Sequence, residues 1–364
     1  MFKRVRATGQ NIPKLVVAQR VLDKMAAAAQ THMQDETGEA MVGLLAPSEA
    51  AEDRATLYVL DTISPDESAV RQFHTFQQGD DRQDELIWWL QENWRVYREK
   101  RRGRINPNRH NKWDVPLRYL GDWHKQPGYM IQPSGGDLMT ALDWIEDPDN
   151  GTDFLLAPIV TLGHPYTVAA ASGSANYVMI PQGDGLSARV DFWYIDIHER
   201  MFMPIAPQIC ADKYLPRLPD YPWHLVNEAR FNDEYKRLQK DGLFTSITLW
   251  NADDQAPLEV CFMAARVGAE NVLIIITPWN YPEAAPKARI APFVHMDADD
   301  DMYDVFETLW EQSEPISVPM EEAWTPERTL LDYVHALEHT LDAPAERADS
   351  TPAEVLPAEP APEE

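Results

Sequence analysis

The sequence Gly121-Asp-Trp-His-Lys-Gln-Pro-Gly-Tyr-Met-Ile-Gln-Pro-Ser-Gly-Gly-Asp137 combines a strand end, a turn and a helix start in one short passage. The apolar run from Val115 to Trp123 predicts a strand, and side chains two residues apart on a strand project from the same face. We therefore expect His124 and Gln126 to face one pocket. Pro133 then ends the extended segment.

The residues after this proline predict a helix that runs to Ile145, with Ser134 at its N-cap and Asp137 at the third helical position. Taken alone, Ser-x-x-Asp is the pattern of a capping box, in which the two side chains bond the free N–H groups of the first turn. Because His124 and Asp137 are also metal-ligand types, the same passage is a candidate metal site.

The spacing His-x-polar, seven residues, then Ser-x-x-Asp resembles the signature of the JAB/MPN metalloprotease family, the JAMM motif. An upstream passage, Glu36-Thr-Gly-Glu-Ala-Met-Val-Gly-Leu-Leu45, resembles the Glu-Thr-Gly-x-x-x-Gly strand of the same family. This resemblance implies an α+β domain over residues 14–205, with a mixed sheet flanked by helices. It also implies a zinc-dependent isopeptidase of the deubiquitinase type.

The family's mechanism needs zinc with three protein ligands and an open position for water, whose pKa falls to about 7. By resemblance His124 and Asp137 are zinc ligands, Glu36 takes the proton from the water, and Ser134 helps to stabilise the oxyanion. Gln126 stands where the family has its second histidine. A neutral amide is a poor zinc ligand beside imidazole, so we expect weak zinc binding and weakened or lost catalysis.

Other candidate residues fit these roles less well. Glu39 lies three residues from Glu36 on the same predicted strand, so it is expected on the opposite face. His32, His164 and His198 are scattered along the chain and are expected to be structural or surface histidines rather than replacement ligands.

Length and composition predict a two-domain cytoplasmic protein. The chain has 364 residues, and no apolar run approaches the roughly 20 residues of a membrane helix. The basic start, Met1 to Arg6, lacks the apolar core of a signal peptide. Two cysteines, Cys210 and Cys261, are too few for a disulfide framework or a multi-thiolate zinc site. The net charge of −27 argues against nucleic-acid binding.

One basic cluster interrupts this acidic composition. It lies at and beyond the C-terminal end of a predicted helix, Asp80 to Lys100, whose dipole the cations complement. Its members are Arg95, Arg98, Lys100, Arg101, Arg102, Arg104, Arg109 and Lys112. They form either a solvated helix face or a docking site for an acidic partner or tail.

The remaining elements of the first domain follow from apolar periodicity. Residues 1–13 are expected to form a basic arm, and residues 206–222 a proline-rich linker. The expected helices and strands are a helix over Leu15–Gln30, the helix over Asp80–Lys100, and strands over Met41–Leu45, Ala55–Ile63, Phe154–Leu162, Tyr177–Pro181 and Arg189–Ile197.

A second domain is predicted over residues 223–341. It should begin with a helix, Trp223–Lys240, followed by an antiparallel meander. The meander strands are Phe244–Trp250, Leu258–Val267 and Asn271–Thr277. The element Tyr281-Pro-Glu-Ala-Ala-Pro286 and the helix pattern Trp324-Thr-Pro-Glu-Arg-Thr-Leu, running on to Leu341, resemble the ubiquitin-conjugating-enzyme and RWD superfamily. Residues 342–364 are expected to form a disordered acidic tail.

This second domain lacks the residues that conjugation requires. The superfamily's thioester cysteine follows the Tyr-Pro element, whereas Cys210 and Cys261 both precede Tyr281. The family's His-Pro-Asn is at best represented by His295-Met-Asp297. A thiol inside an apolar strand, as expected for Cys261, is usually inert. We therefore expect this domain to bind a partner without conjugating it.

Together these patterns predict a JAB/MPN-type isopeptidase of a prokaryotic ubiquitin-like modification system, with catalysis weakened or lost at Gln126. The alternative is a non-catalytic scaffold that docks a ubiquitin-like protein or an enzyme of the conjugation system. Neither hypothesis involves nucleic acid or a membrane.

Overall fold

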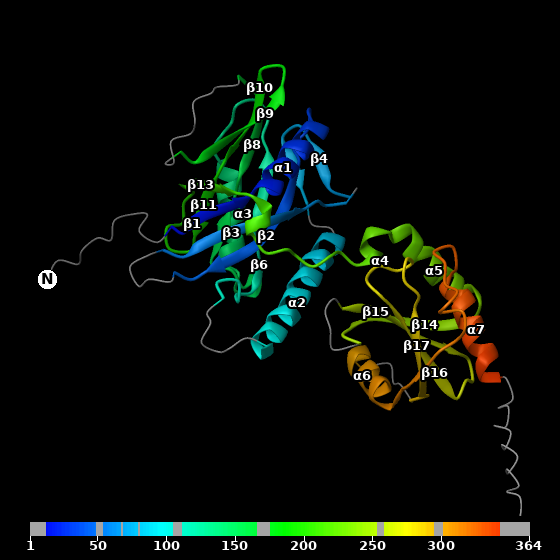
Figure 1. Cartoon of the computed structure of the whole chain (residues 1–364). Coiled ribbons are helices and arrows are strands. Elements are labelled where there is room, and N and C mark those ends of the chain that lie inside the picture. Colours follow the sequence, from blue (N-terminus) through cyan, green and yellow to red (C-terminus); the bar gives the residue numbers. More distant parts are fainter. Residues whose placement is uncertain are drawn as a thin grey trace, which may run out of the picture. The chain divides into compact units, whose positions relative to one another are not determined.

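The computed structural model describes residues 12–48, 54–66, 68–78, 81–104, 111–165, 175–252, 258–294 and 301–342. The chain divides into two compact units, the first formed by residues 1–226 and 251–258 and the second by residues 227–250 and 259–364 (Figure 1). Each unit contains helices and a sheet, which confirms the α+β class. The expected basic arm and acidic tail lie almost entirely outside the described residues. Within the described ranges, no helix could span a membrane.

The first unit is built on an eight-stranded mixed sheet with the order β13-β1-β3-β2-β6-β8-β10-β9. Its strands are β1 (Lys14–Ala18), β2 (Gly38–Ala46), β3 (Thr56–Ile63), β6 (Leu117–Lys125), β8 (Ile159–Pro165), β9 (Tyr177–Gly183), β10 (Leu186–Asp191) and β13 (Pro207–Cys210). Its helices are α1 (Gln19–Thr31), α2 (Asp81–Arg104), α3 (Gly135–Glu146) and α4 (Trp223–Val226). The antiparallel pairing of β2 with both β3 and β6 places β2 inside the sheet.

Smaller elements complete this unit. A three-stranded sheet has the order β12-β11-β7, and β4 pairs with β5 in a separate hairpin. The bounds are β4 (Val70–Gln72), β5 (Thr75–Gln77), β7 (Phe154–Leu156), β11 (Trp193–Asp196), β12 (Met203–Pro204), and the 3-10 turns η1 (Pro148–Asn150) and η2 (Asp212–Tyr214).

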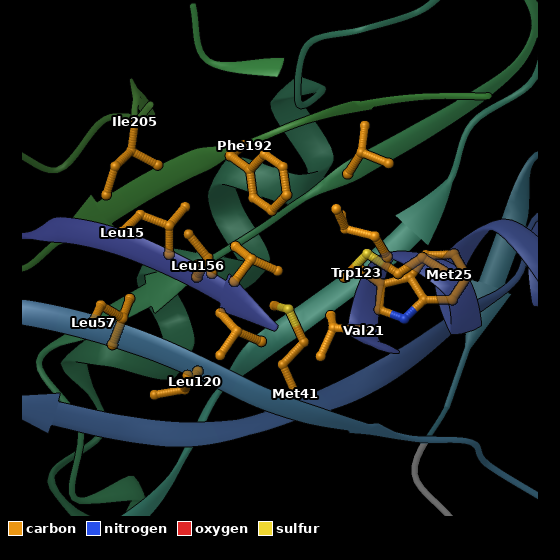
Figure 2. Packing of buried hydrophobic residues seen from close by; sticks show 14 of the residues in the cluster. Leu15, Val21, Met25, Met41, Leu57, Leu120, Trp123, Leu156, Phe192 and Ile205 are labelled. Carbon is orange, nitrogen blue, oxygen red and sulfur yellow. The ribbon is translucent and has the colours of Figure 1, made fainter. Parts of the chain in front are cut away.

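The main core of the first unit lies between α1 and the large sheet (Figure 2). Val21 and Met25, four residues apart on α1, are fully buried and belong to the same cluster as Trp123 of β6 and Met41 of β2. Burial of each such side chain stabilises the fold by about 1.5–3 kcal/mol. This packing fixes β6, and therefore the residues that follow it.

Three elements of the first unit differ from the sequence prediction. The strand expected over Phe154–Leu162 is divided between β7 and β8, which belong to different sheets. The helix expected over Leu15–Gln30 begins only at Gln19, because β1 pairs in parallel with both β3 and β13. The strand expected over Arg189–Ile197 is divided at Phe192 between β10 and β11, which belong to different sheets. In each case pairing with other segments of the chain decides the element, and tertiary context overrides local periodicity.

The passage expected to be a linker, residues 206–222, begins with a strand. β13 pairs in parallel with β1 at the edge of the large sheet. Farther along, the Trp89 indole donates to the Asp220 carbonyl at 3.2 Å, and Arg82 Nη2 donates to the Leu225 carbonyl at 2.7 Å. These contacts attach the passage to the first unit.

The second unit contains a five-stranded antiparallel sheet with the order β14-β15-β16-β17-β18. Its first three strands form the meander that the sequence predicts. The elements are β14 (Leu243–Trp250), β15 (Glu259–Arg266), β16 (Asn271–Thr277), β17 (Lys287–Pro292), β18 (Glu314–Ile316), α5 (Glu228–Lys240), α6 (Met302–Gln312) and α7 (Leu330–Asp342).

The helix expected over Trp223–Lys240 is interrupted at Asn227. This residue has φ −129° and ψ 64°, and its side chain accepts a bond from the Arg230 N–H at 3.2 Å, so it caps the new helix α5. The helix expected from Trp324 begins at Leu330 instead. The preceding residues form turns, and the last of them, Thr329, exchanges hydrogen bonds with Asp332 in the first turn of α7.

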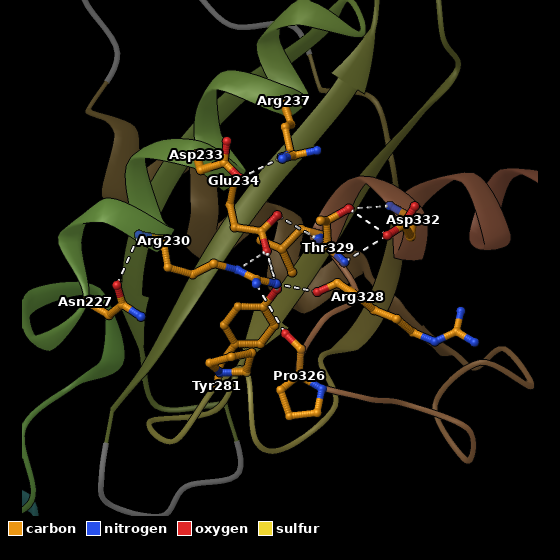
Figure 3. Close-up of polar contacts among 12 residues, drawn as sticks. Asn227, Arg230, Asp233, Glu234, Arg237, Tyr281, Pro326, Arg328, Thr329 and Asp332 are labelled. Carbon is orange, nitrogen blue, oxygen red and sulfur yellow. Dashed lines mark hydrogen bonds and ion pairs between the residues drawn. The ribbon is translucent and has the colours of Figure 1, made fainter.

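A buried polar cluster holds the second unit's separate segments together (Figure 3). Glu234 of α5 is fully buried and accepts hydrogen bonds from the Tyr281 hydroxyl, from Arg230 Nε at 2.8 Å and from the Leu330 N–H at 2.8 Å. Arg230 also donates to the Pro326 carbonyl at 3.2 Å. Helix α5, the Tyr281 loop and the start of α7 are therefore linked through one carboxylate.

Candidate functional site

The candidate site forms where β6 ends beside the beginning of β2. Gly38 of β2 is paired with His124 of β6, and the register shifts nearby around Gly121. Gly121 has φ +115°, and a Cβ there would lie 2.3 Å from the Leu156 carbonyl oxygen, so only glycine fits this bulge. The bulge sets which side chains at the end of β6 point toward the site.

Three of the predicted site residues meet at this point. The Gln126 amide nitrogen lies 3.1 Å from His124 Nε2 and 3.4 Å from Asp137 Oδ2. His124 Nε2 and Asp137 Oδ1 are 3.9 Å apart. Because a carboxylate only accepts, the NH₂ side of the amide is the one that faces Asp137. The side chains of His124 and Gln126 share a face, as the strand pattern predicts.

The other end of the amide has no such contact. Gln126 is almost fully buried, and its Oε1 has no hydrogen-bond partner within the described ranges. Buried side-chain oxygens are normally bonded. This oxygen is therefore a buried acceptor that is left without a partner among the described residues.

Ser134 and Asp137 form the capping box that the sequence predicts. The Ser134 N–H donates to Asp137 Oδ2 at 2.6 Å, and the Asp137 N–H donates to Ser134 Oγ at 3.2 Å. Such caps stabilise a helix by about 1 kcal/mol. The cap also orients Asp137 so that its second oxygen, Oδ1, is the one nearest His124.

The two glutamates of the Glu-Thr-Gly passage have different surroundings. Burial raises the pKa of the Glu36 carboxyl, and the nearby Asp137 carboxylate raises it further. Glu39 is buried and accepts hydrogen bonds from the Ser64 hydroxyl and, at 3.3 Å, from the Trp123 indole. Glu36 is therefore the glutamate associated with the candidate site, and Glu39 belongs to the core side of the sheet.

The imidazole of His124 is held as a neutral acceptor. Burial lowers its pKa, and the Asp137 carboxylate only partly opposes this effect. With Nε2 unprotonated, the ring accepts the Gln126 amide N–H across their 3.1 Å separation. The Gln126 amide N–H thus lies where the lone pair of His124 Nε2 would otherwise bind a metal.

The donor set does not fit catalytic zinc. A catalytic zinc site needs three anionic or imidazole ligands, and only His124 and Asp137 are of these types. Across the described ranges, no group of three or more His, Cys, Asp or Glu side chains is arranged to hold a metal. Of the scattered histidines, His164 instead pairs with the Thr161 hydroxyl at 2.7 Å and packs on Tyr129.

A pocket of about 230 Å³ adjoins Gln126. Its apolar walls come from Met33, Phe73, Tyr129 and Leu162, which are far apart in the sequence. The first three of these side chains are more than half exposed. Large exposed apolar groups gathered beside a polar site are typical of a binding surface.

The two cysteines lie in different units and differ in burial. Cys261 is fully buried in β15, and burial raises the pKa of its thiol well above the usual value. Cys210 lies in β13, which belongs to the first unit. The segment His295–Asp297, which stood for the family's His-Pro-Asn, lies outside the described residues.

Several members of the basic cluster are paired. Arg95 contacts Glu92 at 2.8 Å and Glu99 at 3.0 Å, and Arg98 contacts Asp114 at 3.2 Å. Exposed pairs such as those of Arg95 are worth little stability, yet they neutralise the cation. These contacts favour the solvated-face interpretation of the cluster.

Comparisons with known proteins leave the family open. No protein-family model and no curated protein matches the chain. Among solved structures, one match is the solution structure of protein DSY2949 from Desulfitobacterium hafniense, with 14% identity. The match covers 54% of this chain and 93% of that chain with a TM-score of 0.26. At that TM-score the likeness supports no argument about fold or function.

Proposed function

We propose that the chain is a non-catalytic recognition protein of a ubiquitin-like modification system. The observation that carries this proposal is the Gln126 amide, which bonds to His124 and Asp137 where the JAB/MPN family has a metal-ligating histidine. The first unit is then a JAB/MPN-like domain whose site binds a partner and does not hydrolyse it.

The spatial arrangement supports the JAB/MPN part of the proposal. Two sequence motifs far apart in the chain come together: Glu36 precedes β2, and His124 lies near the end of the neighbouring strand β6. Ser134 and Asp137 then open helix α3 beside them. A chance similarity in sequence would not require these segments to be adjacent.

The competing function is a weak zinc isopeptidase. Glu36 has the raised pKa that suits a general base, which favours that hypothesis. Gln126, in the position of the third ligand, argues against that hypothesis. An amide oxygen is a poor ligand for zinc, and here the amide nitrogen of Gln126 is the atom that faces His124 and Asp137. The donor set therefore favours recognition over hydrolysis.

The adjoining pocket suits the extended C-terminal tail of a ubiquitin-like protein. Its apolar walls, including Phe73 and Tyr129, would enclose the tail's side chains. Binding would then take place beside the altered residue, because Gln126 also lines this pocket.

For the second unit we propose a conjugating-enzyme-like or RWD-like recognition role. Helix α5, the meander, the Tyr281-Pro282 loop and α7 occur in the order of that superfamily. The proposal requires that no thioester forms on this chain. Incubation with the activating enzyme and ubiquitin-like protein of the same organism should give no reducible adduct, and an adduct lost in Cys210→Ser or Cys261→Ser would contradict it.

Calorimetric titration of the full chain with ubiquitin-like proteins of the same organism tests the binding role. We expect Tyr129→Ala and Phe73→Ala to weaken binding by about tenfold each, since each removes a large contact without disturbing the core. Tyr214→Ala is the matched control, because Tyr214 is equally exposed but lies in η2 outside the pocket. An affinity that is unchanged in both pocket variants, or after removal of the partner's C-terminal tail, would contradict the proposal.

A further inference from the structure

The edge strand β14 of the second unit differs from the other edge strands of the two larger sheets in the described part of the chain. Its sequence, Leu243-Phe-Thr-Ser-Ile-Thr-Leu-Trp250, has no charged residue and no proline over eight residues. It pairs along its full length with β15, and no described strand pairs with its other side. A long uncharged edge is a template for pairing with another chain.

The other edges of the two larger sheets carry the usual protection. The opposite edge of the same sheet, β18, has only three residues and includes Pro315. In the first unit, the edges β13 and β9 contain Pro207 and Pro181. Proline blocks strand addition because it lacks an N–H. Only β14 among these four edges is left without proline or charge.

We infer that β14 is a dimer interface, through which two copies of this chain pair antiparallel across a twofold axis. Such an axis keeps the same faces of the two sheets on one side, so opposed residues must come from the same face of β14. Centring the axis on Ile247 satisfies this condition. Phe244 then lies opposite Trp250 of the second copy, and Ser246 lies opposite Thr248.

The side chains explain why the partner is a second copy. Phe244 is 64% exposed, although it is a large aromatic residue. Trp250 is half-buried and packs on the α6 side of the sheet, 5.0 Å from Phe306 between ring centroids. In the twofold pairing, Phe244 of each copy lies against the aromatic cluster around Trp250 of the other copy. Aromatic cross-strand pairs are among the most favourable. Covering Phe244 in this way needs no other protein.

The remaining residues of β14 are also compatible with this pairing. Thr245 would oppose Leu249, and Ile247 would oppose itself, on the face that packs toward α5. No like charges meet anywhere along the strand, because it has none. This inference rests on β14 alone and is independent of the proposed function.

Sedimentation of the full chain over a range of concentrations tests the dimer. We expect a concentration-dependent dimer that becomes monomeric in Phe244→Lys, because a charged side chain on the edge opposes pairing. At concentrations at which the unmutated chain is also monomeric, the melting temperature of the variant should be unchanged, since Phe244 is exposed. A chain that stays monomeric up to about 1 mM, or a dimer unaffected by Phe244→Lys, would overturn the inference.

A cross-linking experiment tests the register. Opposed residues of an antiparallel pair have Cα atoms about 4.5–5.5 Å apart, which a disulfide can bridge. In a Cys210→Ser background, Ile247→Cys should therefore form a disulfide dimer under mild oxidation. Leu249→Cys is the control, because the two copies of that residue would be separated by about 13 Å or more along the strand. Equal cross-linking of both variants, or of neither, would overturn the twofold register.

Discussion

The side-chain amide nitrogen of Gln126 lies 3.1 Å from Nε2 of His124, and it is also 3.4 Å from Asp137. A histidine at position 126 would add a second imidazole to this group. Glutamine instead supplies an N–H that satisfies the lone pair of the first imidazole. The three side chains converge as metal ligands would, but hydrogen bonds among themselves hold them together.

The two glutamates near this site should respond differently to substitution. Glu39→Ala removes the acceptor of the buried Trp123 indole N–H and of the Ser64 hydroxyl, so we expect a loss of about 1–3 kcal/mol in the free energy of unfolding. Glu36→Gln is the control and should change it by no more than about 0.5 kcal/mol. Urea unfolding measures both. A larger loss in the Glu36 variant would contradict the assigned strand register.

Asp122 should make stability depend on pH. Burial raises the pKa of this carboxyl from 3.8 to about 6, while its bond from the Tyr119 hydroxyl, at 2.7 Å, works in the opposite direction. Because the pKa in the folded protein is above the unfolded value, the fold is weakened as pH rises from about 4 to 6, and this cost persists above that range.

Asp122→Asn removes that ionisation and keeps an oxygen for Tyr119. We expect the variant to gain stability relative to the unmutated chain at pH 8, by up to about 3 kcal/mol, and to gain none at pH 4. Asp143→Asn, at an exposed position of α3, is the control and should show no such difference between the two pH values. Thermal unfolding at both pH values measures the effect, and equal gains at pH 4 and pH 8 would contradict it.

Removal of the Glu234 carboxylate should strongly destabilise the second unit. Glu234→Ala leaves the largely buried Arg230 guanidinium without its carboxylate partner, which typically costs about 3–5 kcal/mol. Asp233→Ala removes the neighbouring exposed pair with Arg237, which contributes little to stability, and is the matched control (Figure 3). Chemical denaturation measures the loss in the free energy of unfolding of each variant. Similar losses in the two variants would contradict this account.

Local sequence signals predicted much of the site. The strand–turn–helix passage, the capping box of Ser134 and Asp137, and the shared face of His124 and Gln126 follow from spacings of two and three residues. The opposite placement of Glu39 follows from strand alternation. These features depend on neighbouring residues in one segment, which is why sequence reasoning reaches them.

Features that depend on distant segments were missed. Val16 and Val17 lie in an apolar run too short to separate a strand from a helix, and only pairing with β3 and β13 decides it. The pocket beside Gln126 joins Met33, Phe73 and Tyr129 from three separate segments. One missed break did carry a local signal, because Asn227 is a preferred N-cap residue.

The zinc content of the purified protein tests the central claim most directly. After equilibration with zinc and removal of free metal, elemental analysis of the unmutated chain should find well below one zinc per chain. Gln126→His, which restores a third ligand of a suitable type, should raise the content toward about one zinc per chain, and Gln126→Leu should not. Full zinc occupancy in the unmutated chain would show that other groups complete the site and would contradict the non-catalytic account.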